Sequence, residues 1–265
     1  MFAVTTLQAL GLGQQVRDRD LSAIRTWYHQ FRETSNGAER FSEMVHNMSG
    51  IRYNVMTNVP FDPTETQHWN AGKTHSRHYR TAVRVDPMLA GDRPKLEATL
   101  RSQGYDITLE GAREFLRYWI DRLQPEYVMA STPHNFRLPE TGYNLEALTA
   151  PGAFAEAIVA GGSQCDPSDD DLATQIDENS DLLSDVLMKV CQERDLPVAL
   201  KIGAHRQINP RLEQAGDGIV SFADANMLAR LCTRFPKVRF LATFLSRNNQ
   251  QEACVLASKF SNLHI

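Results

Sequence analysis

Four polar side chains with the chemistry to bind a substrate lie at or just beyond the ends of apolar, strand-like runs of the sequence. They are Asn58, Arg84, His205 and Arg247. Guanidinium and amide groups bond to carboxylates and hydroxyls, so this set favours a polyhydroxylated acid over an apolar or cationic ligand. The prediction requires that the strands end at one edge of a sheet, where their side chains can converge.

Two of these residues also have a structural interpretation, which stays open. The Asn58 amide either bonds a substrate hydroxyl or caps the turn before Pro60. Arg84 lies inside a strand-like run, where an arginine is costly unless it is paired or meets an anion. Its partner is then either an anionic ligand or Asp86, two residues further along the same strand face.

The sequence contains no motif that identifies a catalytic nucleophile or a metal site. It has no His-x-His, no His-Glu-x-x-His and no Gly-x-Ser-x-Gly. His75 and His78 have the spacing of metal ligands but no third ligand nearby. Two interpretations therefore stay open, a metal-binding pair and a surface loop. The acidic stretch 166–185 lacks the spacing of a calcium loop and favours a solvated segment. We therefore assign no catalytic residue and no metal ligand.

Strand-like and helix-like segments alternate along the chain and would position these side chains. The expected strands are 51–58, 79–85, 127–131, 197–202 and 238–245, with the start of a sixth at 263–265. The expected helices are 21–31, 95–104, 109–123, 180–194, 223–235 and 249–260. Strands separated by helical crossovers predict an α/β fold with a parallel sheet. Polar strand ends favour a (β/α)8 barrel, in which chemistry takes place at the carboxyl ends of the strands.

Composition excludes several other classes of protein. The chain of 265 residues has 28 Lys and Arg against 32 Asp and Glu, a net charge of −4, which argues against nucleic acid as a partner. No apolar run approaches the ~20 residues of a membrane span. The four cysteines form no Cys-x-x-Cys and indicate reduced thiols of a cytoplasmic protein. We expect a small molecule as the partner.

Five segments together resemble the uronate (glucuronate) isomerases, a branch of the metal-dependent amidohydrolase superfamily. Residues 55–62, Val-Met-Thr-Asn-Val-Pro-Phe-Asp, resemble the family's Val-Met-Thr-Asn-Asp-Pro-Phe-Asp, with Val59 in place of an acidic residue. The other segments follow in the family's order: 83–87, 203–217, 244–251 and 256–263. The resemblance is loose between residues 136 and 180.

The resemblance implies a distorted (β/α)8 barrel that interconverts an aldose-type and a ketose-type hexuronate, such as glucuronate and fructuronate. Proton transfer between C1 and C2 would be assisted by a divalent metal, with zinc as the expected ion. By position, Arg84 matches a substrate-contacting arginine and Arg247 the arginine of the Leu-Ser-Arg segment. His205 lies in the loop segment after the fourth expected strand.

The length of the chain indicates that it corresponds to the middle of such an enzyme. The five intervals between expected strands average roughly 42 residues, so eight units would need ~340 residues. The family's His-x-His pair and its metal aspartate would lie before residue 1 and beyond residue 265. We therefore expect one incomplete barrel domain over 1–265 that lacks the metal ligands.

Three interpretations stay open at this point. The first is a truncated uronate isomerase that needs further strands for activity. The second is a non-catalytic remnant or sugar-acid binding module. The third is another hydrolase of the superfamily, in which His205 would ligate the metal. Exposed sheet edges would make the chain alone poorly soluble or self-associating, and a homo-oligomer is left open.

Overall fold

The computed structural model describes residues 2–34, 37–72, 77–89, 92–133, 136, 182–206, 208–212 and 218–265. The chain divides into two compact units. Unit 1 comprises residues 1–56 and 69–80, and unit 2 comprises residues 57–68 and 81–265. The single barrel domain expected over 1–265 stays a prediction.

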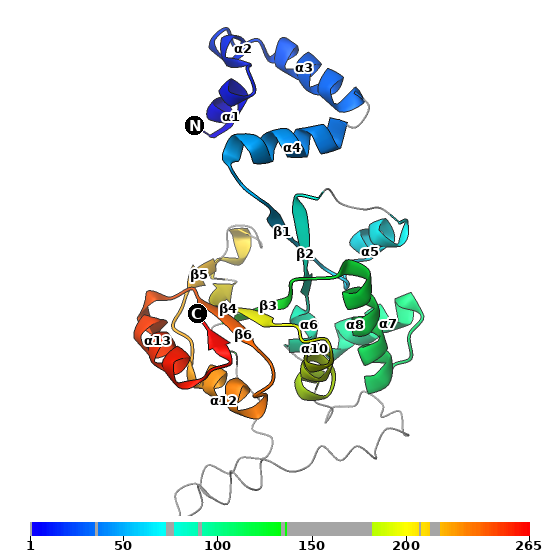
Figure 1. Ribbon diagram of the computed structural model, residues 1–265, viewed down its shortest axis with the longest axis vertical. Coiled ribbons are helices and arrows are strands. Elements are labelled where there is room, and N and C mark those ends of the chain that lie inside the picture. Colours follow the sequence, from blue (N-terminus) through cyan, green and yellow to red (C-terminus); the bar gives the residue numbers. More distant parts are fainter. Residues whose placement is uncertain are drawn as a thin grey trace, which may run out of the picture. The chain divides into compact units, whose positions relative to one another are not determined.

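Unit 1 is mainly helical (Figure 1). Its helices are α1 (Phe2–Ala9), α2 (Gly13–Arg17), α3 (Leu21–Glu33) and α4 (Gly37–Ser49). Helix α3 confirms the expected helix, and the Asp20 carboxylate caps it by accepting the N–H of Ala23 at 2.9 Å. Helices α1, α2 and α4 were not expected from the sequence.

One sheet runs through the strands in the order β1-β2-β3-β4-β6-β7, and β5 pairs with β4 beside this path. The strands are β1 (Asn54–Asn58), β2 (Tyr79–Arg84), β3 (Tyr127–Pro133), β4 (Val198–Arg206), β5 (Gly218–Val220), β6 (Phe240–Phe244) and β7 (Leu263–His264). The pairs β2–β3, β3–β4, β4–β6 and β6–β7 are parallel. The parallel α/β fold is confirmed, and β7 is the start of the sixth expected strand.

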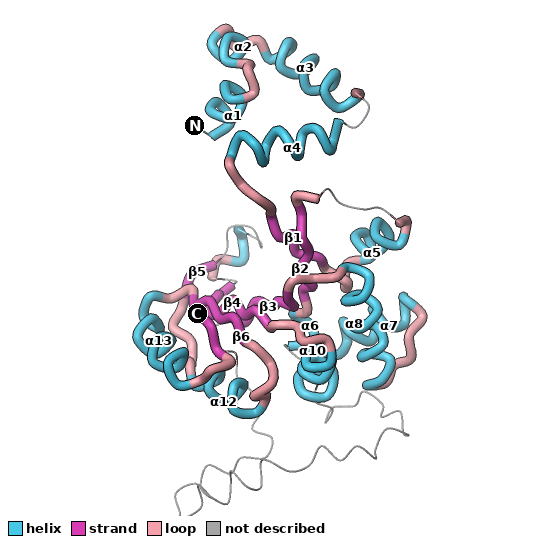
Figure 2. The backbone as a smooth tube through the Cα atoms, in the orientation of Figure 1, coloured by secondary structure: helices cyan, strands magenta, loops and turns pink. Residues whose placement is uncertain are grey.

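Helical segments separate the strands of unit 2 along the chain (Figure 2). They are α5 (Pro63–Asn70), whose first six residues belong to unit 2, α6 (Asp86–Leu89), α7 (Arg93–Gln103), α8 (Leu109–Leu123), the π-helix η2 (Leu182–Met188), α10 (Lys189–Glu193), the 3-10 turns η3 (Pro210–Leu212) and η4 (Arg247–Asn249), α12 (Asn226–Arg234) and α13 (Gln250–Lys259). Helix α8 has the bounds that its apolar stripe predicts, and that stripe is buried. No helix in the described ranges is both long and apolar enough to cross a bilayer.

The two faces of the sheet differ in burial. One face is the core of unit 2, because its side chains on β3, β4 and β6 are at most 2% exposed: Val128, Ala130, Thr132, Val198, Leu200, Ile202, Phe240 and Ala242. The residues between them point the other way, since successive side chains of a strand alternate. We call this second side the open face, because Lys201 and Thr243 on it are exposed.

The fourth strand is longer than the sequence predicted. Gly203 was expected to end it, but β4 continues to Arg206 and pairs with the antiparallel strand β5. Gly203 has a φ of +104°, and a Cβ there would lie 3.0 Å from the carbonyl oxygen of Ser221. Glycine therefore lets the strand turn and continue instead of ending it. His205 consequently lies within β4, not in a loop after it.

Candidate functional site

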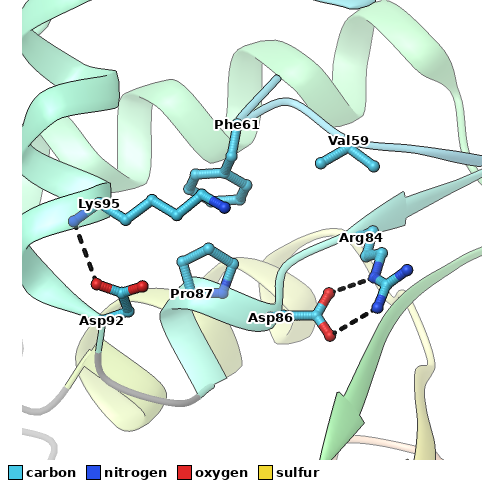
Figure 3. Close-up of a pocket in the computed structure, with 7 residues that line it drawn as sticks. All are labelled: Val59, Phe61, Arg84, Asp86, Pro87, Asp92 and Lys95. Carbon is cyan, nitrogen blue, oxygen red and sulfur yellow. Dashed lines mark hydrogen bonds and ion pairs between the residues drawn. The ribbon is translucent and has the colours of Figure 1, made fainter. Parts of the chain in front are cut away.

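A cavity of about 340 Å³ lies at the carboxyl ends of β1 and β2, within unit 2 (Figure 3). Its lining combines two cationic, two anionic and three apolar side chains: Val59, Phe61, Arg84, Asp86, Pro87, Asp92 and Lys95. A concave site with a few charged groups among apolar walls is the usual form of a small-molecule site. The cavity contains Arg84, which the sequence singled out for ligand binding.

The segment after β1 is anchored to the helices that surround it. The Gln103 side chain donates to the carbonyl oxygen of Pro60 at 2.9 Å, and it accepts the indole N–H of Trp119 at 3.0 Å. Phe61 is 6% exposed, and its ring lies 5.4 Å from that of Phe115. Helices α7 and α8 therefore hold the apolar wall of the cavity in place.

Arg84 is held by an ion pair with Asp86, on which the Arg84 guanidinium makes two hydrogen bonds (Figure 3). One joins Arg84 Nε to Asp86 Oδ2, and the other joins Nη2 to Oδ1 at 3.2 Å. Arg84 Nη2 also donates to Ser131 Oγ at 3.4 Å. Hydrogen bonding to Asp86 raises the pKa of Arg84 above its ordinary value, so the guanidinium is always charged. Of the two partners that the sequence left open, the structure shows Asp86.

Helix α7 contributes a second cation and a second anion to the cavity. Asp92 caps the helix, because its Oδ1 accepts the backbone N–H of Lys95 at 3.2 Å. The Lys95 side chain extends along the cavity on the side of Phe61 (Figure 3). The sequence analysis did not select Asp92 or Lys95. The available signal was the helix start Asp-Arg-Pro, which follows the second strand closely.

Asn58 is buried against α5, and it does not line the cavity. Its side chain is 5% exposed, and its Nδ2 donates to Glu65 Oε1 at 2.9 Å. The other carboxylate oxygen of Glu65 accepts the N–H of Val59 at 3.0 Å. Glu65 therefore fixes the end of β1, and it is Glu65, to which Asn58 is bonded, that accepts the backbone N–H at the start of the turn. The Oδ1 atom of Asn58 is buried and has no hydrogen-bond partner among the described residues. A role for Asn58 in substrate binding stays a prediction.

His205 and Arg247 lie near the carboxyl ends of β4 and β6. His205 Nδ1 is 3.3 Å from Ser221 Oγ, which joins β4 to the segment after β5. Arg247 begins η4, three residues after β6 ends, and its side chain is exposed. Because β2, β4 and β6 run in the same direction, Arg84, His205 and Arg247 lie toward one edge of the sheet. Their roles stay predictions.

The two asparagines of η4 differ in burial. Asn248 and Asn249 follow Arg247 directly in the sequence, but Asn249 is fully buried. Its side chain accepts the N–H of Ala223 at 3.1 Å and donates to the carbonyl oxygen of Ala223 at 2.6 Å. Asn249 therefore joins η4 to the segment before α12 and is not available to a ligand. Asn248 is exposed.

Comparison with known proteins gives matches among solved structures. No protein-family model and no curated protein matches the chain. A uronate isomerase from Bacillus halodurans is 29% identical with a TM-score of 0.69, and the match covers 98% of this chain and 53% of that one. A glucuronate isomerase from Caulobacter crescentus is 19% identical with a TM-score of 0.53, covering 83% of this chain and 47% of that one. A uronate isomerase from Thermotoga maritima is 15% identical with a TM-score of 0.52, covering 89% of this chain and 56% of that one.

The chain resembles the uronate isomerases. The Bacillus match carries this conclusion, because it extends over almost the whole of this chain, whereas the two more distant matches show the fold alone. The chain spans about half the length of the uronate isomerases that it matches. The resemblance read from five sequence segments is thus confirmed by the structure.

The described residues do not fit the metal that uronate isomerase chemistry implies. No group of three or more His, Cys, Asp or Glu side chains in these ranges could hold a metal ion. Of the candidate pair His75 and His78, His75 lies outside the described residues, as does most of the acidic stretch 166–185. We therefore assign no step of a reaction to a metal held by the described residues.

Proposed function

We propose that this protein acts in the interconversion of aldose-type and ketose-type hexuronates, with glucuronate and fructuronate as the first pair to test. The observation that supports this most is the match of 98% of the chain to a uronate isomerase at 29% identity. The reaction moves a proton between C1 and C2 of the sugar through an enediol. A divalent metal, with zinc as the first candidate, is part of the proposal, and we assign none of its ligands among the described residues.

Within this proposal the chain supplies substrate-binding groups. Arg84 is charged and oriented before substrate arrives, because Asp86 fixes two of its nitrogens. Groups that are already oriented lose little entropy on binding, which favours affinity. Arg84 then donates its remaining N–H groups to sugar oxygens. Arg247, His205 and Asn58 are proposed as further substrate-binding residues at the neighbouring strand ends.

The function is tested with the protein purified from its own host, in whatever length the host makes it. Glucuronate is added, and fructuronate is measured by NMR. We expect the ketose to form, its formation to stop when a chelator removes the metal, and activity to return with zinc. Absence of conversion of both glucuronate and galacturonate by the metal-loaded protein would contradict the proposal.

The contribution of Arg84 is tested by Arg84→Gln, with Arg230→Gln as the matched control. Arg230 is an exposed residue of α12, away from the strand ends. We expect Arg84→Gln to weaken glucuronate binding by about tenfold or more, because a charge-assisted hydrogen bond is lost, whereas Arg230→Gln leaves binding unchanged. Equal affinities for both variants would remove Arg84 from the binding site.

A further inference from the structure

Lys201 occupies an unusual place for a lysine, in the middle of the parallel sheet. It lies in β4, which has β3 on one side and β6 on the other. Its neighbours Leu200 and Ile202 are at most 1% exposed and belong to the core face, so Lys201 points to the open face, where it is exposed. Lysines in strands commonly protect sheet edges from pairing with other chains, but β4 is not an edge strand. The position therefore calls for another explanation.

The strand register shows what surrounds Lys201. Ser131 of β3 and Thr243 of β6 are its direct partners in the neighbouring strands. Partners in register lie on the same face of a sheet, about 4.8 Å apart between adjacent strands. We call these three residues the Ser131–Lys201–Thr243 row. It places one ammonium group between two hydroxyl groups on the open face.

The row continues into the cavity through Arg84. Arg84 is in register with Met129, which lies two residues before Ser131 and hence on the same face. Arg84 Nη2 bonds Ser131 Oγ at 3.4 Å. Ser131 thus connects the cavity at the end of β2 with Lys201 on β4.

Arg84 and Lys201 differ in their electrostatic state. The charge of Arg84 is balanced by Asp86, on which it makes two hydrogen bonds. The Lys201 side chain makes no hydrogen bond or ion pair within the described part of the chain. The uncompensated positive charge of the row is therefore that of Lys201, and a carboxylate gains more from an unpaired cation than from one already neutralised.

We propose that Lys201 binds the carboxylate of the sugar acid, with Ser131 and Thr243 contacting its hydroxyls. A hexuronate carries one carboxylate and several hydroxyls, which matches the one ammonium and two hydroxyl groups of the row. This inference rests on the proposed function, and it assigns the group that distinguishes a sugar acid from a neutral sugar. Arg84 then contacts the uncharged part of the substrate.

The test measures binding by calorimetry and ligand-observed NMR on the 265-residue chain, with chelator present so that metal does not contribute. The ligands are glucuronate, glucose and inorganic phosphate. The variants are Lys201→Met, which removes the charge at similar size, Lys201→Arg, which keeps it, and Lys259→Met as a control at an exposed position of α13. Circular dichroism checks that each variant is folded.

We expect Lys201→Met to weaken glucuronate binding at least tenfold, while Lys201→Arg and Lys259→Met stay within about threefold of the unchanged chain. The weaker binding of glucose should not change in Lys201→Met. The inference is overturned if Lys201→Met binds glucuronate as the unchanged chain does, or if the unchanged chain does not bind glucuronate. It is also overturned if glucose or phosphate binds as tightly as glucuronate, since the site would then not select a sugar carboxylate.

These outcomes are separate from those of the proposed function. Isomerase activity is measured by ketose formation in the metal-loaded protein, whereas the role of Lys201 is measured by binding without metal. A chain that binds glucuronate through Lys201 but never yields a ketose would refute the isomerase and retain the binding site. Ketose formation by the metal-loaded protein, together with unaltered glucuronate binding in Lys201→Met, would retain the isomerase function and refute the role of Lys201.

Discussion

Asp86 bonds Arg84 and the backbone of Ser131 at the same time. Its Oδ1 atom accepts Arg84 Nη2 at 3.2 Å and the N–H of Ser131 at 2.9 Å, and its Oδ2 atom accepts Arg84 Nε. The carboxylate thereby links the end of β2 to β3 while it orients the guanidinium. Three donors on one carboxylate make Asp86 a structural residue as well as the counterion of Arg84.

Removal of this carboxylate should cost stability. We expect Asp86→Ala to lower the free energy of unfolding by about 1–2 kcal/mol, because Ser131 loses an acceptor and the partly exposed Arg84 loses its counterion. Asp86→Asn, which keeps an acceptor, should cost about half as much. The control is Asp121→Ala, which breaks an exposed ion pair with Arg194 and should cost about 0.5 kcal/mol or less. Urea denaturation measures all three, and equal losses for Asp86→Ala and Asp121→Ala would contradict the linking role.

Glu65 should be needed for the conformation of the segment after β1. Glu65→Ala removes the acceptor of the buried Asn58 amide and of the Val59 N–H, so we expect a loss of about 2–3 kcal/mol in the free energy of unfolding. Gln67→Ala, at an exposed position on the same helix, should change stability by less than about 0.5 kcal/mol. Urea denaturation compares the two variants. If Glu65→Ala is as stable as Gln67→Ala, Asn58 and Val59 do not depend on this carboxylate.

Truncation of the two asparagines of η4 should destabilise the protein to different extents. Asn249→Ala leaves the N–H and the carbonyl oxygen of Ala223 without their buried partner, so we expect a loss of about 2–4 kcal/mol. Asn248→Ala changes an exposed side chain and should cost less than about 0.5 kcal/mol. Thermal denaturation of the pair checks this difference. A greater loss of stability for Asn248→Ala than for Asn249→Ala would show that Asn248, and not Asn249, is the buried residue.

Cys191 should make stability dependent on alkaline pH. Full burial raises the pKa of its thiol to about 12, whereas an unfolded cysteine has a pKa of about 8.5. Below about pH 8.5 both states hold the proton, and above it the unfolded state releases the proton first. Stability is therefore lost as the pH rises from about 8.5 toward 12, by about 2 kcal/mol at pH 10.

Cys191→Val removes this titration at similar volume. Relative to Cys191→Val, the unchanged chain should lose stability between pH 8 and pH 10 in urea denaturation. Cys254→Val, at an exposed position, serves as the control and should follow the unchanged chain across this range. A constant difference between the unchanged chain and Cys191→Val would show that the Cys191 thiol is not buried in the folded state.

The regular elements of unit 2 follow from local patterns in the sequence. Helix α8 could be predicted to its ends, because its apolar residues recur at helical spacing along one stripe. Strands β2 and β3 are short apolar runs that end at Asp-Pro and Thr-Pro, so their centres could be predicted too. Helices α1 and α2 lack such a signal, whereas α4 carries one at Phe41, Met44, Val45 and Met48 that the sequence analysis missed. Strand β5 has three residues and depends on pairing with β4.

The candidate site was predictable only in part. The sequence identified Arg84 and offered Asp86 as one of two partners, since alternation puts residues two apart on the same face of a strand. It did not select Lys95, because the cavity brings α7 beside a strand end only through packing. It also missed Lys201, for which the one signal was a single charge within the run Val-Ala-Leu-Lys-Ile.

The sequence by itself determined which residues alternate along each strand and where the main helices and strands occur, because both depend on neighbours a few residues apart. Only the tertiary structure decided which face of each strand is buried. Asn249 became a buried link because η4 packs against the segment that holds Ala223, and Lys201 became an exposed cation between two hydroxyls because the core lies on the other face of β4. That difference depends on contacts between residues far apart in the chain, which no local pattern encodes.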